Sequence, residues 1–247
     1  MMTAPHMRGV AGRAMPEWFD QEVSELERRS RARRDVRNPI MLYGSSSFTL
    51  WNDVQAYLPG YNLLNHGFGG ATLADCVEYF DRLVVPFAPR IVILYAGDND
   101  LGDGGQPETV LARLRSFIAR KRETLGDVPM AYVSIKISPA RFAIMHRIAY
   151  TNRIIERELR NAPDVRYLDI MRRMVGRGIE PFLAYYTEDP LHMNRKGYRV
   201  LGRTLSEYLI DMERAHGNLR SSPPTSAQAP MQAPMPEALT SPQPVST

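Results

Sequence analysis

The segment that decides the fold is PIMLYGSSS, residues 39–47. It joins a run of apolar residues, Pro39–Tyr43, to one glycine and three consecutive serines. A short continuous apolar run that ends in small polar residues is typical of a strand buried on both faces. The next residues, at about 49–57, have a helical pattern, and we expect the helix to begin near Phe48 or Thr49. The segment therefore predicts a buried strand, a tight turn and a helix.

Further apolar runs follow the same design and alternate with helical patterns. The predicted strands are residues 39–43, 62–65, 91–95, 130–135 and 165–170. The helical patterns cover about 49–57, 73–84, 106–124, 141–161 and 195–214. This alternation predicts an α/β fold, a three-layer α/β/α sandwich around a five-stranded parallel sheet. Right-handed crossovers favour the flavodoxin-like strand order 2-1-3-4-5.

The length of the chain, 247 residues, suits one well-buried domain. We divide it into an N-terminal helical extension (1–37), the α/β domain (38–216) and a tail (217–247). The extension contains one predicted helix, from roughly Pro16 to Arg34. The tail is rich in Pro, Ala and Ser and nearly free of charge, so we expect it to be disordered.

Charge gives no sign of a nucleic-acid partner. The formal net charge is only +4, and many of the arginines lie close together at Arg28, Arg29, Arg31, Arg33, Arg34 and Arg37. Acidic residues precede this cluster on the same segment, which favours a solvated helix end over a site for nucleic acid or an anionic surface.

Three further classes of protein are disfavoured by composition. The single cysteine, Cys76, excludes an intramolecular disulfide framework and a cysteine-built zinc site, and we expect it to be packed in a helix. No apolar run approaches the roughly 18 residues that span a bilayer. The first residues also lack the apolar core of a secretion signal, so a cytoplasmic location is the default expectation.

The predicted strand order places two polar segments together. In open α/β sheets, ligands bind at the carboxyl ends of the strands, where the strand order reverses. Here that point lies between strands one and three. Residues 44–47 (GSSS) leave the first of these strands and residues 96–100 (AGDND) leave the third. The topology therefore predicts a site that both segments line.

Ser46 is a candidate nucleophile within the first of these segments. A serine between a strand and a helix is held on rigid backbone, and the first helical N–H groups point toward charge that develops beside it. The same position also suits a helix cap, for which serine is a favoured residue. Three adjacent serines can fill both roles, so the residues alone leave both interpretations open.

A serine nucleophile needs a base, and His192 is the best-placed of five histidines. His6 and His216 lie near the ends, and His146 lies in a helical pattern beside two arginines. His192 follows Asp189 by three residues, a spacing that brings the two side chains together on a turn or helix. Asp189 can then orient the imidazole and stabilise its charged form.

Attack on an ester carbonyl also needs donors for the oxyanion. The Asn99 amide, the Gly70 N–H and the Ser46 N–H are the candidates, although Asn99 also suits a turn and Gly70 a flexible loop. A phosphate loop at residues 67–70 (GFGG) is disfavoured because no lysine or GK[ST] follows. Asp98, Asp100 and Asp103 have the spacing of a calcium loop, but the glutamate at its twelfth position is missing.

Together these segments resemble the SGNH hydrolase superfamily, the GDSL-like lipases and acylhydrolases. Residues 44–46 (GSS) are similar to its Gly-Asp-Ser block, Gly70 to its second-block glycine, and residues 97–100 (GDND) to its Gly-x-Asn-Asp block. Residues 189–192 (DPLH) are similar to Asp-x-x-His, and the resemblance covers roughly 38–212. One departure is Ser45, where the family usually has aspartate.

The resemblance implies a role for each matching residue. Ser46, Asp189 and His192 would be catalytic, and Ser46, Gly70 and Asn99 would form the oxyanion hole. Residues 65–73 (NHGFGGATL) look closest to the platelet-activating-factor acetylhydrolase-like, short-acyl branch. The expected activity is hydrolysis of a small-molecule ester, with no metal or organic cofactor. A thioesterase or lysophospholipase, or a binding protein without chemistry on the same fold, remain the alternatives. Of the aromatic residues, Trp51, Phe68, Tyr185 and Tyr186 suit either a pocket wall or the core.

Overall fold

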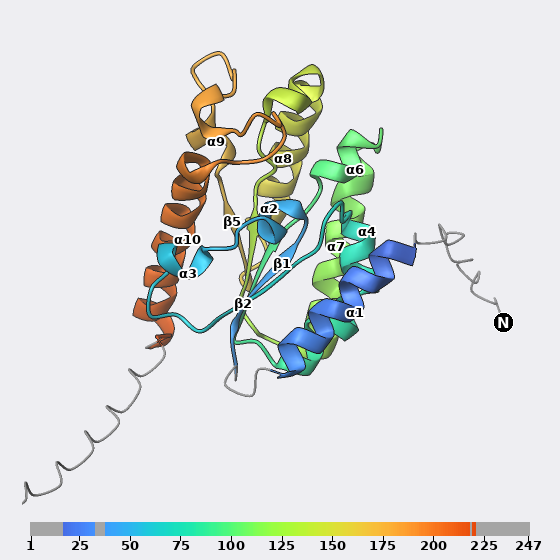
Figure 1. The fold of residues 1–247 in the computed structure, drawn as a ribbon, viewed down its shortest axis with the longest axis vertical. Coiled ribbons are helices and arrows are strands. Elements are labelled where there is room, and N and C mark those ends of the chain that lie inside the picture. Colours follow the sequence, from blue (N-terminus) through green and yellow to red (C-terminus); the bar gives the residue numbers. More distant parts are fainter. Residues whose placement is uncertain (1–16, 33–37, 218, 221–247) are drawn as a thin grey trace, which may run out of the picture.

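Five parallel strands form one sheet between two layers of helices in a computed structural model of the chain (Figure 1). The structure describes residues 17–32, 38–217 and 219–220. The strands are β1 (Ile40–Gly44), β2 (Leu63–Gly67), β3 (Ile91–Tyr95), β4 (Met130–Val133) and β5 (Val165–Leu168). They lie in the order β2-β1-β3-β4-β5, and every neighbouring pair is parallel. The predicted fold class and strand order are confirmed.

The central strands are apolar throughout because helices cover both of their faces. Met41 and Tyr43 of β1 point into one helical layer, while Ile40 and Leu42 point into the other. All four side chains are fully buried. Strand β5 lies at the edge of the sheet, and its Arg166 is exposed.

Helices of different length make up the two layers. One face carries α1 (Glu17–Ala32), α4 (Leu73–Glu78), α5 (Phe80–Leu83), α7 (Pro107–Leu125) and α8 (Met145–Leu159). The other face carries α2 (Ser46–Thr49), α3 (Val54–Tyr57), α9 (Met171–Met174) and α10 (Arg195–His216). Helix α6 (Asp98–Gly102) follows β3, and 3₁₀ turns occupy Val85–Phe87, Pro139–Ile144 and Leu183–Tyr185.

The predicted helix at 49–57 is wrong. Two single turns, α2 and α3, replace it, and α2 begins at Ser46 rather than near Phe48 or Thr49. The chain leaves the helix between them so that the buried Trp51 ring can stack on Tyr198 of α10, with ring centroids 5.3 Å apart. Packing of one large aromatic side chain therefore overrides the helical pattern.

Other predicted helices and strands differ less from the observed ones. The predicted helix at 73–84 is divided at Tyr79, whose hydroxyl donates to Asp20 of α1 (2.9 Å). The first residues of the helix predicted at 141–161 form a 3₁₀ turn instead. Strand β2 runs two residues beyond its predicted end, to Gly67.

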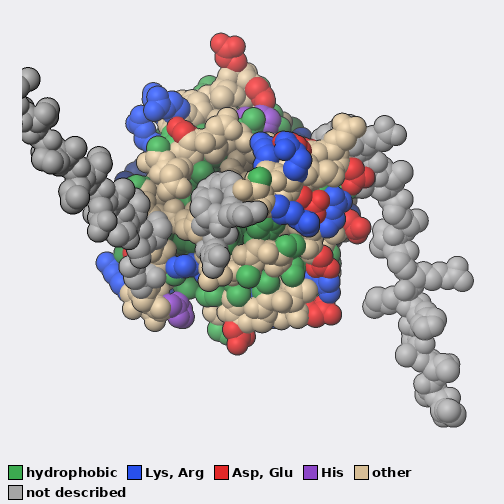
Figure 2. Space-filling view, turned by 60° about the horizontal axis from the view of Figure 1, so that its bottom comes forward, with side chains coloured by type: hydrophobic (Ala, Val, Ile, Leu, Met, Phe, Trp, Pro, Cys, Tyr) green, Lys and Arg blue, Asp and Glu red, His purple; other side chains and the backbone are tan. Residues whose placement is uncertain are grey.

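Helix α1 packs on the same core as the sheet. Phe19, Val23 and Leu26 are buried against residues of β1, β2 and α5. On its outer side Arg28 forms an ion pair with Glu25 (2.7 Å). Figure 2 shows acidic and basic side chains next to one another on the right of the view, as expected for a solvated surface. Part of the predicted arginine cluster, residues 33–37, lies outside the described residues.

Two residues of the predicted tail, Leu219 and Arg220, lie within the described part of the chain. Leu219 is buried in the core, and Arg220 pairs with Tyr61 in an isolated antiparallel bridge. These two residues of the predicted tail therefore contact the α/β domain. Residues 221–247 lie outside the described part of the chain, so for them disorder stays a prediction, as do the proposed domain limits.

Candidate active site

The turn after β1 depends on a glycine at position 44. Gly44 has φ +135°, and a Cβ atom there would lie 2.0 Å from the carbonyl oxygen of Tyr95 in β3. Only glycine lets the chain bend this close to the neighbouring strand. The Ser45 N–H then donates to that same carbonyl (2.9 Å), and Ser46 becomes the first residue of α2.

The three serines of this turn have different environments. Ser45 and Ser47 are each 2% exposed, whereas Ser46 is only partly buried. Ser45 occupies the N-cap position of α2, but its side chain makes no capping hydrogen bond. The structure therefore gives no support to the capping interpretation and leaves Ser46 as the accessible hydroxyl.

A tight turn between Tyr186 and Met193 holds Asp189 and His192. The Asp189 carboxylate accepts the Leu191 N–H with Oδ1 (2.9 Å) and the His192 Nδ1–H with Oδ2. These two donors, chiefly the Leu191 N–H, hold the pKa of Asp189 below its usual value. Thr187 closes the turn, because its hydroxyl donates to the Asp189 carbonyl (2.7 Å).

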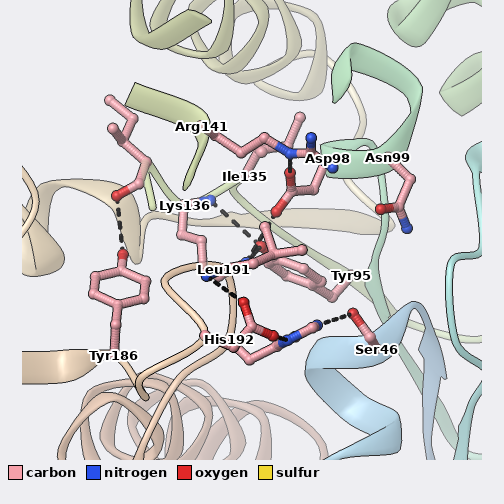
Figure 3. A network of polar contacts seen from close by, with 12 residues as sticks. Ser46, Tyr95, Asp98, Asn99, Ile135, Lys136, Arg141, Tyr186, Leu191 and His192 are labelled. Carbon is pink, nitrogen blue, oxygen red and sulfur yellow. Dashed lines mark hydrogen bonds and ion pairs between the residues drawn. The ribbon is translucent and has the colours of Figure 1, made fainter. Parts of the chain in front are cut away.

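The same imidazole reaches Ser46. His192 Nε2 lies 3.0 Å from Ser46 Oγ (Figure 3). A chain of hydrogen bonds therefore joins Ser46, His192 and Asp189. The His192 side chain is 21% exposed and that of Asp189 is 55% exposed, so the chain lies at the surface. With Nδ1 donating to the carboxylate, Nε2 is free to take the serine proton.

The three predicted oxyanion donors lie in the segments that follow β1, β2 and β3. The N–H groups of Ser46 and Gly70 donate to no described residue. Gly70 lies in an exposed turn with φ +71°. Asn99 Nδ2 donates to the Ala71 carbonyl (3.0 Å), which ties the start of α6 to the Gly70 turn and leaves the second amide hydrogen unused among the described residues.

A buried ionic cluster, which the sequence did not reveal, lies where the chain leaves the carboxyl ends of β3 and β4. Asp98 accepts from Lys136 Nζ (2.9 Å) and from Arg141 Nε (3.0 Å). Lys136 Nζ also lies 3.3 Å from the Tyr95 hydroxyl. Burial raises the pKa of Asp98, but Lys136 and Arg141 outweigh it and lower that pKa overall. The only sequence signal was a lysine among the apolar residues after β4.

Asp100 has a separate partner and a structural role. Its carboxylate accepts from Arg113 (2.7 Å) and from the Leu73 N–H at the start of α4 (2.9 Å). Burial raises the pKa of Asp100, although Arg113 and the Leu73 N–H oppose this shift. Asp98 and Asp100 therefore pair with the charged side chains of different residues. Carboxylates used in this way do not fit the calcium loop considered for this segment.

The remaining candidate residues from the sequence lie in the core or on the surface of a helix. Cys76 is fully buried in the core, as expected, and His146 is exposed on α8. Trp51 and Phe68 belong to the core, and the buried Tyr186 donates its hydroxyl to the Ile137 carbonyl (2.9 Å). No helix in the described ranges is both long and apolar enough to cross a bilayer.

The sheet order and the hydrogen-bonded serine, histidine and aspartate define an α/β protein with the features of an ester hydrolase. The profile of the GDSL-like Lipase/Acylhydrolase family matches residues 41–200. The chain belongs to this family and is a carboxylic-ester hydrolase. A comparison with curated protein sequences found no significant match.

Solved structures with the same fold come from several bacteria. A protein of Streptococcus pneumonia named for platelet activating factor is 20% identical, with a TM-score of 0.68 over 78% of this chain and 94% of that one. A GDSL-like lipase of Bacteroides thetaiotaomicron is 16% identical, with a TM-score of 0.64 over 77% and 99%. A family 3 carbohydrate esterase of Clostridium thermocellum is 17% identical, with a TM-score of 0.58 over 73% and 100%.

Proposed function

We propose that the chain is a serine esterase that hydrolyses short-chain, acetyl-type esters through an acyl-enzyme on Ser46. The observation that carries the proposal is the chain of hydrogen bonds from Ser46 through His192 to Asp189, with 3.0 Å between Oγ and Nε2. A serine hydroxyl becomes an effective nucleophile when a base takes its proton and a third group orients that base.

The first half of the reaction forms the acyl-enzyme. Ser46 Oγ attacks the ester carbonyl carbon while His192 Nε2 takes the hydroxyl proton. Negative charge develops on the carbonyl oxygen, where the N–H groups of Ser46 and Gly70 and the amide of Asn99 stabilise it. When the intermediate collapses, the bond to the alcohol breaks and His192 returns the proton to the departing oxygen.

The second half releases the acid. Water attacks the acyl group on Ser46, and His192 takes a proton from that water and then returns one to Ser46 Oγ. Asp189 keeps Nδ1 protonated throughout and stabilises the imidazolium that forms twice in each cycle. Every proton transfer in this sequence uses protein groups and water.

The proposed preference for short acyl groups rests on similarity to other proteins. Residues 65–73 (NHGFGGATL) resemble the short-acyl branch of the family, and one structural neighbour is a carbohydrate esterase. A thioesterase or lysophospholipase would use the same residues on other substrates. Rates on 4-nitrophenyl esters of two to twelve carbons, and on the matching thioesters, separate these activities: we expect the highest kcat/KM on the acetate.

The direct test compares three serine variants on 4-nitrophenyl acetate. We expect Ser46→Ala to abolish turnover, while Ser45→Ala and Ser47→Ala in the same turn retain it. A Ser46→Ala protein that keeps the wild-type rate would remove Ser46 from catalysis. A wild-type protein that turns over none of these esters or thioesters would favour a binding protein on the same fold.

A further inference from the structure

The buried ionic cluster of Lys136, Asp98 and Arg141 carries one more positive charge than negative charge. Lys136 Nζ lies 2.9 Å from one carboxylate oxygen of Asp98, and Arg141 Nε lies 3.0 Å from the other. The Lys136 and Asp98 side chains are 2% and 6% exposed, so they neutralise each other inside the protein. The Arg141 side chain is 23% exposed, and its charge is the surplus.

The guanidinium of Arg141 is held in a fixed orientation. Its Nε is bonded to Asp98, and its plane lies against Gly102, where a Cβ atom would come within 2.3 Å of Cζ. Neither Nη group donates to a described residue. A guanidinium anchored at Nε presents its Nη donors as a rigid fork, which matches the geometry of a carboxylate or phosphate.

Two hydrogen bonds place this cation near the candidate active site. The Ala140 N–H donates to the Pro190 carbonyl (3.1 Å), which joins the Arg141 segment to the turn that carries Asp189 and His192. On the other side, the Asp98 partner of Arg141 directly precedes Asn99. Figure 3 shows Arg141 and Asp98 on the Asn99 side of the Ser46–His192 pair. Arg141 therefore bridges the turn that carries the base and the helix that carries Asn99.

We propose that Arg141 binds an anionic group of the substrate, and that the natural substrate is an ester whose alcohol portion carries a carboxylate or phosphate. This inference rests on the proposed esterase function and adds a substrate class to it. The departing alcohol receives its proton from His192, so it leaves beside the turn to which the Arg141 segment is bonded. The proposal pairs a negative charge on that alcohol with the Nη donors of Arg141, which no described residue uses.

The test uses an ester pair that differs by one charge. 3-Acetoxybenzoate carries a carboxylate on its alcohol portion, and methyl 3-acetoxybenzoate does not. We expect wild-type protein to favour the carboxylate, and Arg141→Gln to lower the ratio of the two kcat/KM values about tenfold, mainly through KM. Arg141→Lys keeps the positive charge but lacks the paired Nη donors, so its ratio of the two kcat/KM values should lie between those of wild type and Arg141→Gln. The matched control, Arg153→Gln, removes an exposed arginine of α8 and should leave the ratio unchanged.

Binding measurements keep the test independent of turnover and of the stability of the Arg141 variants. Calorimetry on Ser46→Ala protein should show tighter binding of 3-hydroxybenzoate than of its methyl ester. Equal binding of the two, or an Arg141→Gln variant that slows both esters equally, would overturn the anion site. If neither ester is hydrolysed by wild-type protein while 3-hydroxybenzoate still binds preferentially, the esterase function fails and the Arg141 site stands.

Discussion

Among the residues that the structure describes, two serines contact a histidine. Ser46 Oγ lies 3.0 Å from His192 Nε2, and Ser30 Oγ lies 2.5 Å from His66 Nε2. Ser30 borders a cavity of about 570 Å³ that residues of α1 and β2 help to line, but Ser30 is only 7% exposed, whereas Ser46 is partly buried. By distance alone, Ser30 would be as good a nucleophile as Ser46.

The groups behind the two histidines are different. His192 Nδ1 donates to the carboxylate of Asp189, whereas His66 Nδ1 donates to the backbone carbonyl of Leu83 (2.6 Å). His66 is fully buried, and burial lowers its pKa to about 4. A proton moved from Ser30 to His66 would create a buried imidazolium whose ring is hydrogen-bonded to no carboxylate of the described residues, which is unfavourable.

The surroundings of the two hydroxyls also differ. Ser46 begins α2, so its N–H is free to stabilise an oxyanion. Ser30 lies inside α1, where an N–H belongs to the regular hydrogen-bonding pattern of the helix. A short serine–histidine contact therefore does not define a nucleophile. The carboxylate behind the histidine and the unused N–H groups around the serine distinguish the two pairs.

Replacement of each histidine should give the largest difference in ester turnover between the Ser46–His192 pair and the Ser30–His66 pair. We expect His192→Ala to lower kcat/KM for 4-nitrophenyl acetate about 10⁴-fold, because no base then takes the serine proton. His66→Gln should stay within about threefold of wild type when its folding is confirmed by circular dichroism. Comparable losses in both variants would show that the carboxylate is not the deciding difference.

Loss of an oxyanion donor should have the next largest effect. Asn99→Ala should lower kcat by about 100-fold to 1,000-fold with a smaller change in KM, because the donor acts on charge that develops in the transition state. Asn161→Ala, at an exposed position after α8, is the matched control and should leave both constants unchanged. If KM rose and kcat did not change, Asn99 would bind substrate in the ground state instead.

The buried histidine should make stability depend on pH. Its pKa is about 4 in the folded protein and near 6.5 in an unfolded chain. Between these values the unfolded state binds more protons, so the stabilisation is complete above about pH 6.5 and is lost as the pH falls toward 4. This loss amounts to about 3 kcal/mol.

Urea unfolding at several pH values measures this effect. The free energy of unfolding of wild type, minus that of His66→Gln, should fall by about 3 kcal/mol between about pH 7 and pH 4. Other titrating groups cancel in the difference. A difference that does not change with pH would show that His66 titrates normally and is not confined to its neutral form.

The smallest effect is expected for the serine of the buried pair. Ser30→Ala leaves His66 Nε2 without its donor, so the free energy of unfolding should fall by about 1–2 kcal/mol. Ester turnover should remain at the wild-type rate. A clear loss of turnover, with the protein still folded, would assign Ser30 a part in the chemistry.

Much of this molecule was predictable from local patterns. The five apolar runs identified the strands, and the strand order follows from right-handed crossovers. Ser46, Asn99 and the pair Asp189–His192 were found because each lies in a short segment directly after a strand or before the last helix. The choice of Ser46 among three serines depended on family resemblance, and the structure adds that its neighbours are buried.

Features that depend on distant contacts were missed. The helix breaks after α2 because Trp51 stacks on Tyr198 of α10. Tyr198 lies far from Trp51 in the sequence, so a pattern read over a short window of residues does not include this contact. The cluster of Lys136, Asp98 and Arg141 was missed because charged residues read singly suggest a surface. Their burial becomes visible only when β3 and β4 are side by side.

The central claim is that Ser46, and not Ser30, is the activated serine. Labelling with a fluorophosphonate probe, followed by peptide mass spectrometry, tests it directly, because only a serine with an effective base reacts quickly. We predict that the phosphonyl group is found on Ser46 in wild-type protein and that His192→Ala prevents the labelling. A label on Ser30, or labelling of Ser46 that is unchanged in His192→Ala, would contradict the account.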